Sequence, residues 1–600
     1  MKLTKWSKIG ALFSATSLIG LTIGGYAYWA SRDFRPVIMN FESYVSPEAE
    51  KEINKHFQYK VFQELNEFSR AIESQRIVGG FASDFEIARL IISGKLSKIK
   101  YEKILRNIPE LQGDNTSKAF EANGMIKKSI VQKYLRTETM EHIDSYNSYL
   151  KDSKGNIIDI DKDGKADEMW EFMIPYYIQD KVIAYTTGGY KTNQNDSENL
   201  TPLRPDSYNV LTPEEREQGI AFEDQTFTEI LKKLRTKNYS KFTWTEASRD
   251  NLLIGSEVEN SDANKPGQIT YSGEVTPSNY RSMVEGFLKV VREGTGDSVS
   301  NINTNKFVSS GTDILQSLIE PGNPSDAGVI YNGDALDALY SGDNFANVPD
   351  GQINYIRPKN NITLLEGFVF ASYNNEATND KIYDILYESI YRGIDMTTEE
   401  LFKEILSVEK IPFMVENEEG EWVAETTIDE NGKTVEIWEK DGKENYGVII
   451  DYSAVAITRN FDYINYTSSW KADFEVIKKM YFNNAVTTTA EESSIIHVNE
   501  KPLMFEMVKD VEEGDLETKL EEIKSALNID EVSEDVSDAF SQKLLNIFVT
   551  QQKYQTITGG MPTEDTPADQ IYEVHYESIK PINDQLRSEV ITYYNIKTKS

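Results

Sequence analysis

The sequence has 600 residues, of which 39% are hydrophobic and 11% aromatic, and its formal net charge is −35 at pH 7. This composition excludes a disordered chain, and the length is too great for one ordinary core, so we expect two or more lobes. So negative a field repels nucleic acid and favours cationic ligands and metal ions, although acidity also keeps an exported protein soluble. Because the sequence contains no cysteine, neither a disulfide nor a lipid-modified cysteine can be part of it.

The N-terminus combines positive charge with a long apolar segment. Three lysines between residues 2 and 8 precede an uncharged run over residues 9–30. About 20 mostly apolar residues cross a bilayer as a helix, and lysines favour the cytoplasmic side. We therefore expect residues 1–33 to form a single-pass anchor in the cell membrane, with the bulk of the chain outside the cell. A cleaved signal peptide is the alternative, but the run is long for one and Tyr28 and Trp29 crowd its end.

The remaining chain alternates between strand-like and helix-like patterns, which is typical of an α/β fold. Helix signals include Ser46 followed by Pro47, and the capping box formed by Thr397 and Glu400. Residues 416–445 combine charged turns with alternating apolar residues, which predicts an inserted β-hairpin or small meander. The other strand-like runs are residues 37–40, 76–81, 173–189, 325–336 (running into a helix) and 351–358.

The sequence offers little for catalysis. The four histidines show no metal-ligand spacing, and there is no Walker A loop, no GxSxG elbow and no cysteine nucleophile. Pairs of carboxylates are too common in so acidic a chain to indicate glycosidase chemistry. We expect a protein that is not an enzyme and has no catalytic cofactor.

One segment has the pattern of a metal site. Residues 159–168 read DIDKDGKADE, in which three aspartates occupy positions 1, 3 and 5 of a calcium loop and Gly164 provides the sharp turn. Position 12 is Trp170 rather than a glutamate, so a solvated Asp-Gly turn is the alternative. We expect a structural Ca²⁺ that holds a polar insertion over residues 139–170. The predicted ligands are Asp159, Asp161, Asp163, Lys165 (through its carbonyl) and Asp167.

Several segments together resemble the spermidine/putrescine-binding proteins of bacterial ABC importers. NFESYVSPEAEKEINKHF (residues 40–57) resembles the opening strand, loop and helix of that family, and MIPYYIQDKVIAYTTG (173–188) is similar to its crossover segment. GVIYNGDALDAL (328–339) and NYTSSW (465–470) resemble two further family segments. The order is collinear from about Val37 to Trp470, and the chain after that point matches poorly.

The resemblance implies a periplasmic-binding-protein fold, in which two α/β lobes close on a polyamine. Lobe 1 would comprise residues 34–185 and return at about 366–470, and lobe 2 would comprise residues 186–365 and the C-terminal part, 471–600. Carboxylates would bind the ammonium groups, and aromatic faces would cover the methylenes. The ligand-binding residues that the resemblance implies are Phe41, Glu42, Ser43, Tyr44, Ser83, Phe85, Asp250, Tyr331, Glu366 and Tyr466.

These patterns together predict a membrane-anchored, extracellular substrate-binding subunit of an ABC importer. It would bind spermidine or putrescine between its lobes and deliver the ligand to permease subunits coupled to a cytoplasmic ATPase, with no nucleic-acid partner. A different small cationic ligand is an alternative, since Ala247 and Leu364 stand where the family has an aspartate and a tryptophan. A surface interaction or adhesion protein on the same scaffold is another, motivated by the insertions and the unmatched C-terminal stretch.

Overall fold

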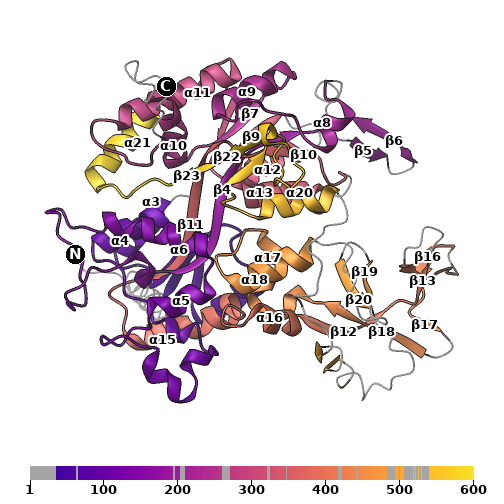
Figure 1. The fold of residues 1–600 in the computed structure, drawn as a ribbon, viewed down its shortest axis with the longest axis horizontal. Helices are drawn as coiled ribbons and strands as arrows, with labels where there is room; N and C mark the ends of the chain where they lie inside the picture. Colours follow the sequence, from indigo (N-terminus) through magenta and orange to yellow (C-terminus); the bar gives the residue numbers. More distant parts are fainter. Residues whose placement is uncertain are drawn as a thin grey trace, which may run out of the picture.

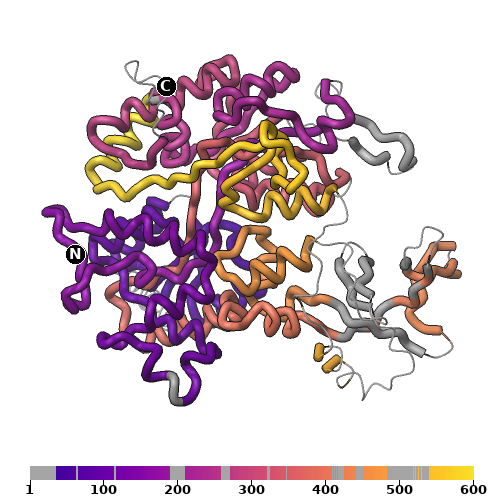
Figure 2. Tube along the Cα trace, in the orientation of Figure 1, coloured from indigo at the N-terminus to yellow at the C-terminus, as the bar shows by residue number. Residues whose placement is uncertain are grey.

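A computed structural model describes most of the chain from residue 35 to residue 599, and Figure 2 traces it. The predicted membrane anchor, residues 1–33, lies outside the described residues. Among the residues that are described, no helix combines the length and the apolar character needed to cross a bilayer. Within 35–599 the description omits residues 63–64, 189, 194–195, 203–209, 260–270, 321–324, 346–347, 417–421, 431, 441–442, 483–493, 499–500 and most of 506–538.

The described chain forms two α/β lobes that share one sheet (Figure 1), which confirms the mixed α/β fold expected from the sequence. The strand order through both lobes is β2-β1-β3-β11-β4-β9-β7-β8. Strands β1, β2 and β3 pair in parallel, as do β7, β8 and β9. The two long connecting strands, β4 (Ile174–Thr186) and β11 (Asn360–Phe370), pair antiparallel to each other and to β3, β9 and β10. The shorter strands are β1 (Val37–Phe41), β2 (Gln58–Phe62), β3 (Gly79–Ser83), β7 (Phe242–Thr245), β8 (Asn305–Val308), β9 (Ala327–Tyr331) and β10 (Ile353–Ile356).

Strand β4 passes through the cores of both lobes, and all of its 13 residues are buried. Its first half packs into the core of the first lobe. In its second half, Ile183 and Tyr185 pack into one apolar cluster of the second lobe, and Val182 and Ala184 pack into the other. This alternation is the period of two that a strand requires. A polar triplet, Gln179–Lys181, separates the two apolar halves at the junction of the lobes.

Helices cover the sheet in the first lobe, and their starts follow the sequence signals. The hydroxyl of Ser46 accepts a hydrogen bond from the backbone N–H of Ala49 at 3.2 Å, with Pro47 as the first helical residue. The Thr397 and Glu400 capping box is also present. The helices are α2 (Pro47–His56), α3 (Leu65–Glu73), α4 (Asp84–Ile92), α5 (Lys128–Tyr134), α6 (Thr137–Ser145), α15 (Glu376–Leu386), α16 (Thr398–Glu404), α17 (Ala456–Ile464) and α18 (Lys471–Val476).

In the second lobe, two helices pack closely because glycine replaces a side chain on each. A Cβ atom on Gly255 would lie 1.9 Å from the carbonyl oxygen of Met283, and one on Gly286 would lie 2.2 Å from that of Gly255. These residues belong to α10 and α11. The helices of this lobe are α8 (Pro213–Glu217), α9 (Phe227–Thr236), α10 (Ser248–Glu259), α11 (Tyr280–Thr295), α12 (Gly311–Ile319), α13 (Asn332–Leu339), α14 (Ser341–Asn344), α20 (Ala539–Phe548) and α21 (Asp584–Lys599).

A separate β-rich body projects from the first lobe, at the right in Figure 1. Its five-stranded sheet pairs strands from residues 406–450 with strands from residues 494–505, and two further hairpins lie beside it. The predicted hairpin or meander is therefore confirmed, in a larger body than expected. Its strands are β12 (Leu406–Ile411), β13 (Met414–Glu416), β14 (Trp422–Ala424), β15 (Thr426–Ile428), β16 (Thr434–Glu436), β17 (Glu439–Lys440), β18 (Lys443–Ile450), β19 (Ser494–Val498) and β20 (Lys501–Phe505).

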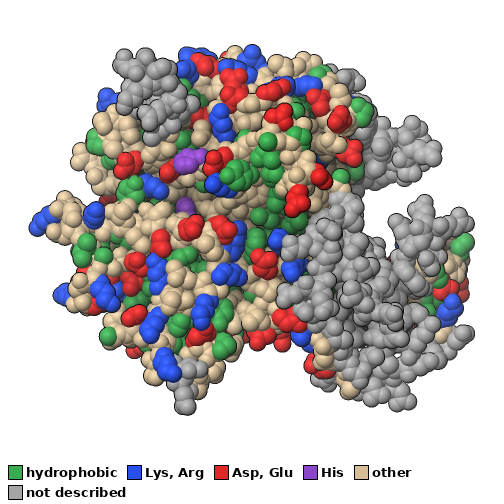
Figure 3. Space-filling model, viewed as in Figure 1, with side chains coloured by type: hydrophobic (Ala, Val, Ile, Leu, Met, Phe, Trp, Pro, Cys, Tyr) green, Lys and Arg blue, Asp and Glu red, His purple; other side chains and the backbone are tan. Residues whose placement is uncertain are grey.

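The last part of the described chain ties the lobes together. Asp180 and Arg357, both fully buried, form an ion pair at 2.9 Å, and Arg357 also donates to backbone carbonyls in the last turn of α20. The remaining short strands are β5 (Tyr190–Asn193), β6 (Asp196–Pro202), β21 (Tyr554–Thr556), β22 (Ile571–Glu573) and β23 (His575–Glu577), the last of which pairs with β11. On the face in Figure 3, acidic and basic side chains are mixed over both lobes, so the negative charge forms no single patch there.

Candidate ligand-binding site

A cavity of about 410 Å³ lies between the two lobes, a volume typical of pockets for small ligands. Its walls come from β1 and α4 of the first lobe, from the shared strands, from α10, β9 and α13 of the second lobe, and from α21. Eight of the ten predicted ligand residues line it: Phe41, Glu42, Tyr44, Phe85, Asp250, Tyr331, Glu366 and Tyr466.

The two predicted serines do not line the cavity. Ser43 is exposed in the turn after β1, with a φ of 57°. Ser83 is buried at the end of β3, where its hydroxyl lies 3.3 Å from a carboxyl oxygen of Glu366. Ser83 therefore supports a cavity residue and does not itself face the space.

Glu366 is a buried carboxyl group in the wall of the cavity, only 3% exposed. It accepts hydrogen bonds from the hydroxyls of Tyr44 and Ser83 and, at 3.4 Å, from the Gln179 amide. Among the described residues, no Lys, Arg or His lies within ion-pair distance of it. Burial without a compensating charge raises its pKa to about 8. The carbonyl oxygen Oε1 of Gln179 is also buried and accepts no hydrogen bond in the described structure.

A second acidic group, Asp334, lies in the first turn of α13. The hydroxyl of Tyr466 donates to its Oδ1 at 2.5 Å, and the ring of Tyr466 lies 5.2 Å from that of Tyr44. The side chain also lies against the start of α12, since a Cβ on Gly311 would meet its Oδ2 at 2.1 Å. Burial still raises the pKa of Asp334 to about 6, although the bond from Tyr466 opposes the shift.

Asp250, the other predicted carboxylate, lies at a different part of the wall and is already paired. Lys181 approaches its Oδ2 at 2.9 Å, Arg249 approaches its Oδ1 at 3.0 Å, and the hydroxyl of Tyr331 donates to it at 2.8 Å. Burial alone would raise the pKa of Asp250, but the charges of Lys181 and Arg249 outweigh it and hold that pKa below its usual value. Asp250 therefore lies in the cavity wall with two cationic partners already in place, and its contact with a ligand stays a prediction.

The same two cations cover aromatic faces that were predicted for the ligand. The ammonium of Lys181 lies 3.4 Å from the ring centroid of Tyr331, and the guanidinium of Arg249 lies 5.2 Å from that of Phe85. Phe41 and Tyr44, whose rings are 5.2 Å apart, have no such cation in the described structure. The aromatic surface beside Glu366 is thus the part that remains for a ligand.

Helix α21 closes one side of the cavity and contacts both lobes. Asp584 pairs with Arg89 at 2.8 Å and Arg587 approaches Glu86 at 3.4 Å, both in the first lobe. Asn251 of the second lobe donates to the hydroxyl of Tyr594 at 2.7 Å. The helix therefore acts as a strap across the mouth of the site. Its residues in the cavity wall are Arg587, Val590, Ile591, Tyr594, Asn595 and Lys599.

Sequence reasoning missed many polar residues of the cavity wall, among them four that contact the predicted ligand residues: Gln179, Lys181, Arg249 and Asp334. A signal existed for the first two, because a polar triplet in the middle of an otherwise apolar strand marks a place where that strand leaves a core. In β4 the period of two turns Gln179 and Lys181 toward the cavity and Asp180 toward Arg357. The other two had no comparable signal in a chain so rich in charge.

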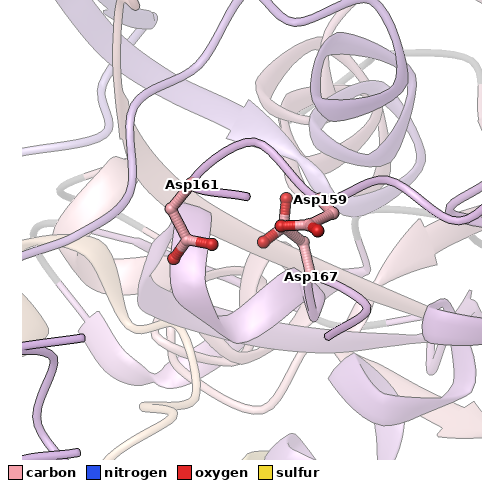
Figure 4. Close-up of side chains that lie close together, drawn as sticks. All are labelled: Asp159, Asp161 and Asp167. Carbon is pink, nitrogen blue, oxygen red and sulfur yellow. The ribbon is translucent and has the colours of Figure 1, made fainter. Parts of the chain in front are cut away.

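The structure gathers part of the predicted calcium loop. One carboxyl oxygen from each of Asp159, Asp161 and Asp167 lies within 4.8 Å of the others (Figure 4), a spacing compatible with a hard cation. Asp163 is not in this group and instead accepts from Asn123 at 3.2 Å. The ammonium of Lys98 already contacts Asp161 at 2.7 Å and Asp167 at 2.5 Å, so it partly neutralises the cluster.

Comparisons with known proteins give a family and several distant structural matches. A family model described as hypothetical lipoprotein (MG045 family) matches residues 14–586. No curated protein sequence matches the chain. Similar solved structures include a spermidine/putrescine ABC transporter substrate-binding protein from Streptococcus pneumoniae, crystallised with calcium and HEPES (12% identity, 59% of this chain and 78% of that chain, TM-score 0.32). A putative spermidine/putrescine ABC transporter from Listeria monocytogenes is another (11% identity, 59% and 79%, TM-score 0.34). A third is the Tp0655 lipoprotein of Treponema pallidum (10% identity, 62% and 83%, TM-score 0.35).

Proposed function

This chain belongs to the hypothetical lipoprotein family named MG045, and we propose that it is the substrate-binding subunit of an ABC importer whose ligand carries a primary amine. The ligand would bind in the cavity between the lobes and pass to permease subunits, energised through them by a cytoplasmic ATPase. Closure of the lobes about β4 and β11 would present the loaded cavity to the permease. Spermidine and putrescine are the first amines to test.

The observation that carries this proposal is the state of Glu366. A carboxyl group buried in a cavity wall normally has a cationic partner, because an isolated buried charge is costly. Glu366 has hydroxyl and amide donors but no cation within reach among the described residues, and the unpaired carbonyl of Gln179 lies beside it. An ammonium group from a ligand would supply both the missing charge and a donor for that carbonyl.

The surrounding aromatic rings suit the carbon chain of an amine. Phe41 and Tyr44 pack with their centroids 5.2 Å apart, and Tyr44 meets Tyr466 edge to face. Such faces cover methylene groups and attract an adjacent ammonium, for about 0.5–2 kcal/mol. Asp334, bonded to Tyr466, adds a second acidic group on this side. The arrangement supports one amine-binding end rather than a row of equivalent charges.

We infer the location of the protein from its N-terminus and its family. A lipoprotein family implies attachment at a membrane, but this sequence has no cysteine to receive a lipid. We propose that the apolar run over residues 9–30 is the anchor instead and that the described lobes lie outside the cell. The acidic loop around Asp161 would bind a structural Ca²⁺ only in competition with Lys98.

Calorimetry on the full chain in mild detergent tests the proposal directly. We expect spermidine and putrescine to bind, and Glu366→Gln to weaken both. Glu257→Gln is a matched control, since Glu257 is 4% exposed and burial raises its pKa to about 7, yet it lies outside the cavity wall. Absence of binding by a folded sample, or equal loss in the two variants, would contradict the assignment of the amine end to Glu366.

A further inference from the structure

The cavity wall also carries two cations, beginning with Lys181, which follows Gln179 by two residues on the same face of β4. Lys181 and Arg249 both pair with Asp250, so two cations share one carboxylate. Asp250 is 2% exposed and Lys181 is 1% exposed, which means that water does little to screen this group of charges. The formal charge of these three side chains is +1, and two further carboxylates, Asp334 near Lys181 and Asp84 near Arg249, attract the same cations.

An unused hydrogen-bond donor lies in the same part of the wall. Nη1 of Arg249 is buried and has no hydrogen-bond partner in the described structure, while Nε is bonded to Asp250 and Nη2 lies 3.4 Å from the hydroxyl of Tyr331. A buried guanidinium N–H without an acceptor costs free energy. Helix α10 begins at Ser248, which also lines the cavity, so the positive end of that helix adds to the field.

Two parts of the cavity wall thus need opposite kinds of ligand group: one needs a hydrogen-bond donor and the other needs an acceptor. Near Glu366, the buried carbonyl oxygen of Gln179 lacks a donor. Near Asp250, the buried Nη1 of Arg249 lacks an acceptor. A diamine would satisfy the first part but would place a second ammonium against Lys181 and Arg249, where like charges repel.

From this polarity, and resting on the proposed function, we infer that the preferred ligand is a small amine that also carries a carboxylate. Its ammonium lies against Glu366 and Gln179, and its carboxylate accepts hydrogen bonds from Arg249 and Lys181. Arginine suits this role because its planar group presents paired donors to a carboxylate. The ligand class is therefore an amino acid. Its ammonium and carboxylate groups are separated by a short carbon chain.

The inference is tested by comparing ligands of matched length on the full chain. The probes are putrescine, 4-aminobutyrate, ornithine, and ω-amino acids of two to six carbons, with affinity measured by calorimetry. We expect at least one amino acid to bind about ten times more tightly than putrescine, because the second ammonium is replaced by a group of the opposite charge.

Substitution of Arg249 tests the proposed carboxylate contact separately from the ammonium contact at Glu366. Arg249→Gln should weaken the best amino acid about tenfold or more and leave putrescine unchanged or tighter, whereas Glu366→Gln should weaken both. Arg106→Gln is a control for loss of an arginine, since Arg106 pairs with Asp384 far from the cavity wall. Thermal unfolding of each variant shows whether it is folded.

The possible results distinguish the inference from the proposed function. Putrescine binding in a Glu366-dependent way, at least as tightly as every amino acid, would overturn the inference and leave the proposed function standing. Equal weakening of putrescine and the amino acid by Arg249→Gln would also overturn it. No binding of any probe to folded protein would refute the proposed function, and the inference with it.

Discussion

Ligand affinity should depend on pH through Glu366. In the free protein, burial raises the pKa of this group from its ordinary 4.5 to about 8, so near pH 7 only about a tenth of the molecules hold it ionised. An ammonium requires the ionised form, and its arrival lowers the pKa again. Affinity should therefore rise about tenfold per pH unit, or about 1.4 kcal/mol, between about pH 6 and 8 and then level off. The ligand amine stays charged over this range.

Calorimetry at several pH values, in buffers that differ in ionisation enthalpy, measures this effect. The slope of observed enthalpy against buffer enthalpy should show close to one proton released per ligand at about pH 7. Glu366→Gln should abolish the release and lower the limiting affinity by about 1.5–3 kcal/mol, the contribution of a charge-assisted hydrogen bond. Glu257→Gln, the matched buried glutamate, should leave both unchanged. Wild-type affinity that is flat between about pH 6 and 9 would refute the reasoning.

The raised pKa of Glu366 should also make the free energy of unfolding depend on pH. Because the pKa of Glu366 is higher in the folded protein than in the unfolded chain, the folded state holds more protons between these two values. Its contribution to the free energy of unfolding therefore falls as pH rises from about 4.5 to about 8. Glu366→Gln should unfold at a higher temperature than wild type at about pH 8 without ligand. An unchanged or lower Tm would mean that Glu366 has a cationic partner in the free protein.

Three further substitutions test other parts of the structure. Gly333→Ala places a Cβ 1.8 Å from Cδ1 of Tyr466, so it should cost about 1–3 kcal/mol in unfolding free energy by overpacking and weaken amine binding; wild-type values in both assays would contradict the packing. Lys98→Gln should strengthen calcium binding at least about tenfold, since it removes the competing ammonium from the acidic cluster; a calcium titration followed by Tm decides this, and an unchanged response would argue against a metal site. Arg587→Glu should set two carboxylates together at Glu86 and speed amide hydrogen exchange in α21 while the core of the first lobe stays protected; equal acceleration of exchange in the first-lobe core would contradict a local effect of this contact.

Helix starts and the fold class could be predicted because their signals lie in the neighbouring residues of the sequence. The start of α2 at Pro47 follows from a serine cap and a proline, and both lie beside the helix in sequence. The mixed α/β class follows from the order of strand and helix patterns. The C-terminal strap, α21, could not be predicted to lie over the cavity, since its position depends on ion pairs such as Arg89 with Asp584 that span almost the whole chain.

The sequence predicted most of the residues named for the cavity wall but not the ion pairs between them and their neighbours. The resemblance indicated eight residues that share the cavity wall, yet it gave no information on what each one pairs with. Asp250 was predicted to bind the ligand, and no sequence signal indicated that Lys181, from a strand of the shared sheet, and Arg249 would pair with it. In a chain with 63 basic and 98 acidic residues, partners in space cannot be assigned from the sequence alone. Glu366 stands out only once its neighbours are known.

The strap has a consequence for how the protein is made. Phe41 and Lys599 line the same cavity, and in the proposed extracellular location the N-terminal part of the chain would cross the membrane first. The first lobe can bury its core before α21 emerges, because domains fold as units during synthesis. The second lobe at that stage still lacks Leu586, Val590 and Tyr594, which belong to its apolar core. Until that helix docks, the cleft has one wall missing and stays open to water. Under the proposed function, retention of ligand is thus a late event in biogenesis, and a nascent or truncated chain would have a complete first lobe but an unfinished binding site.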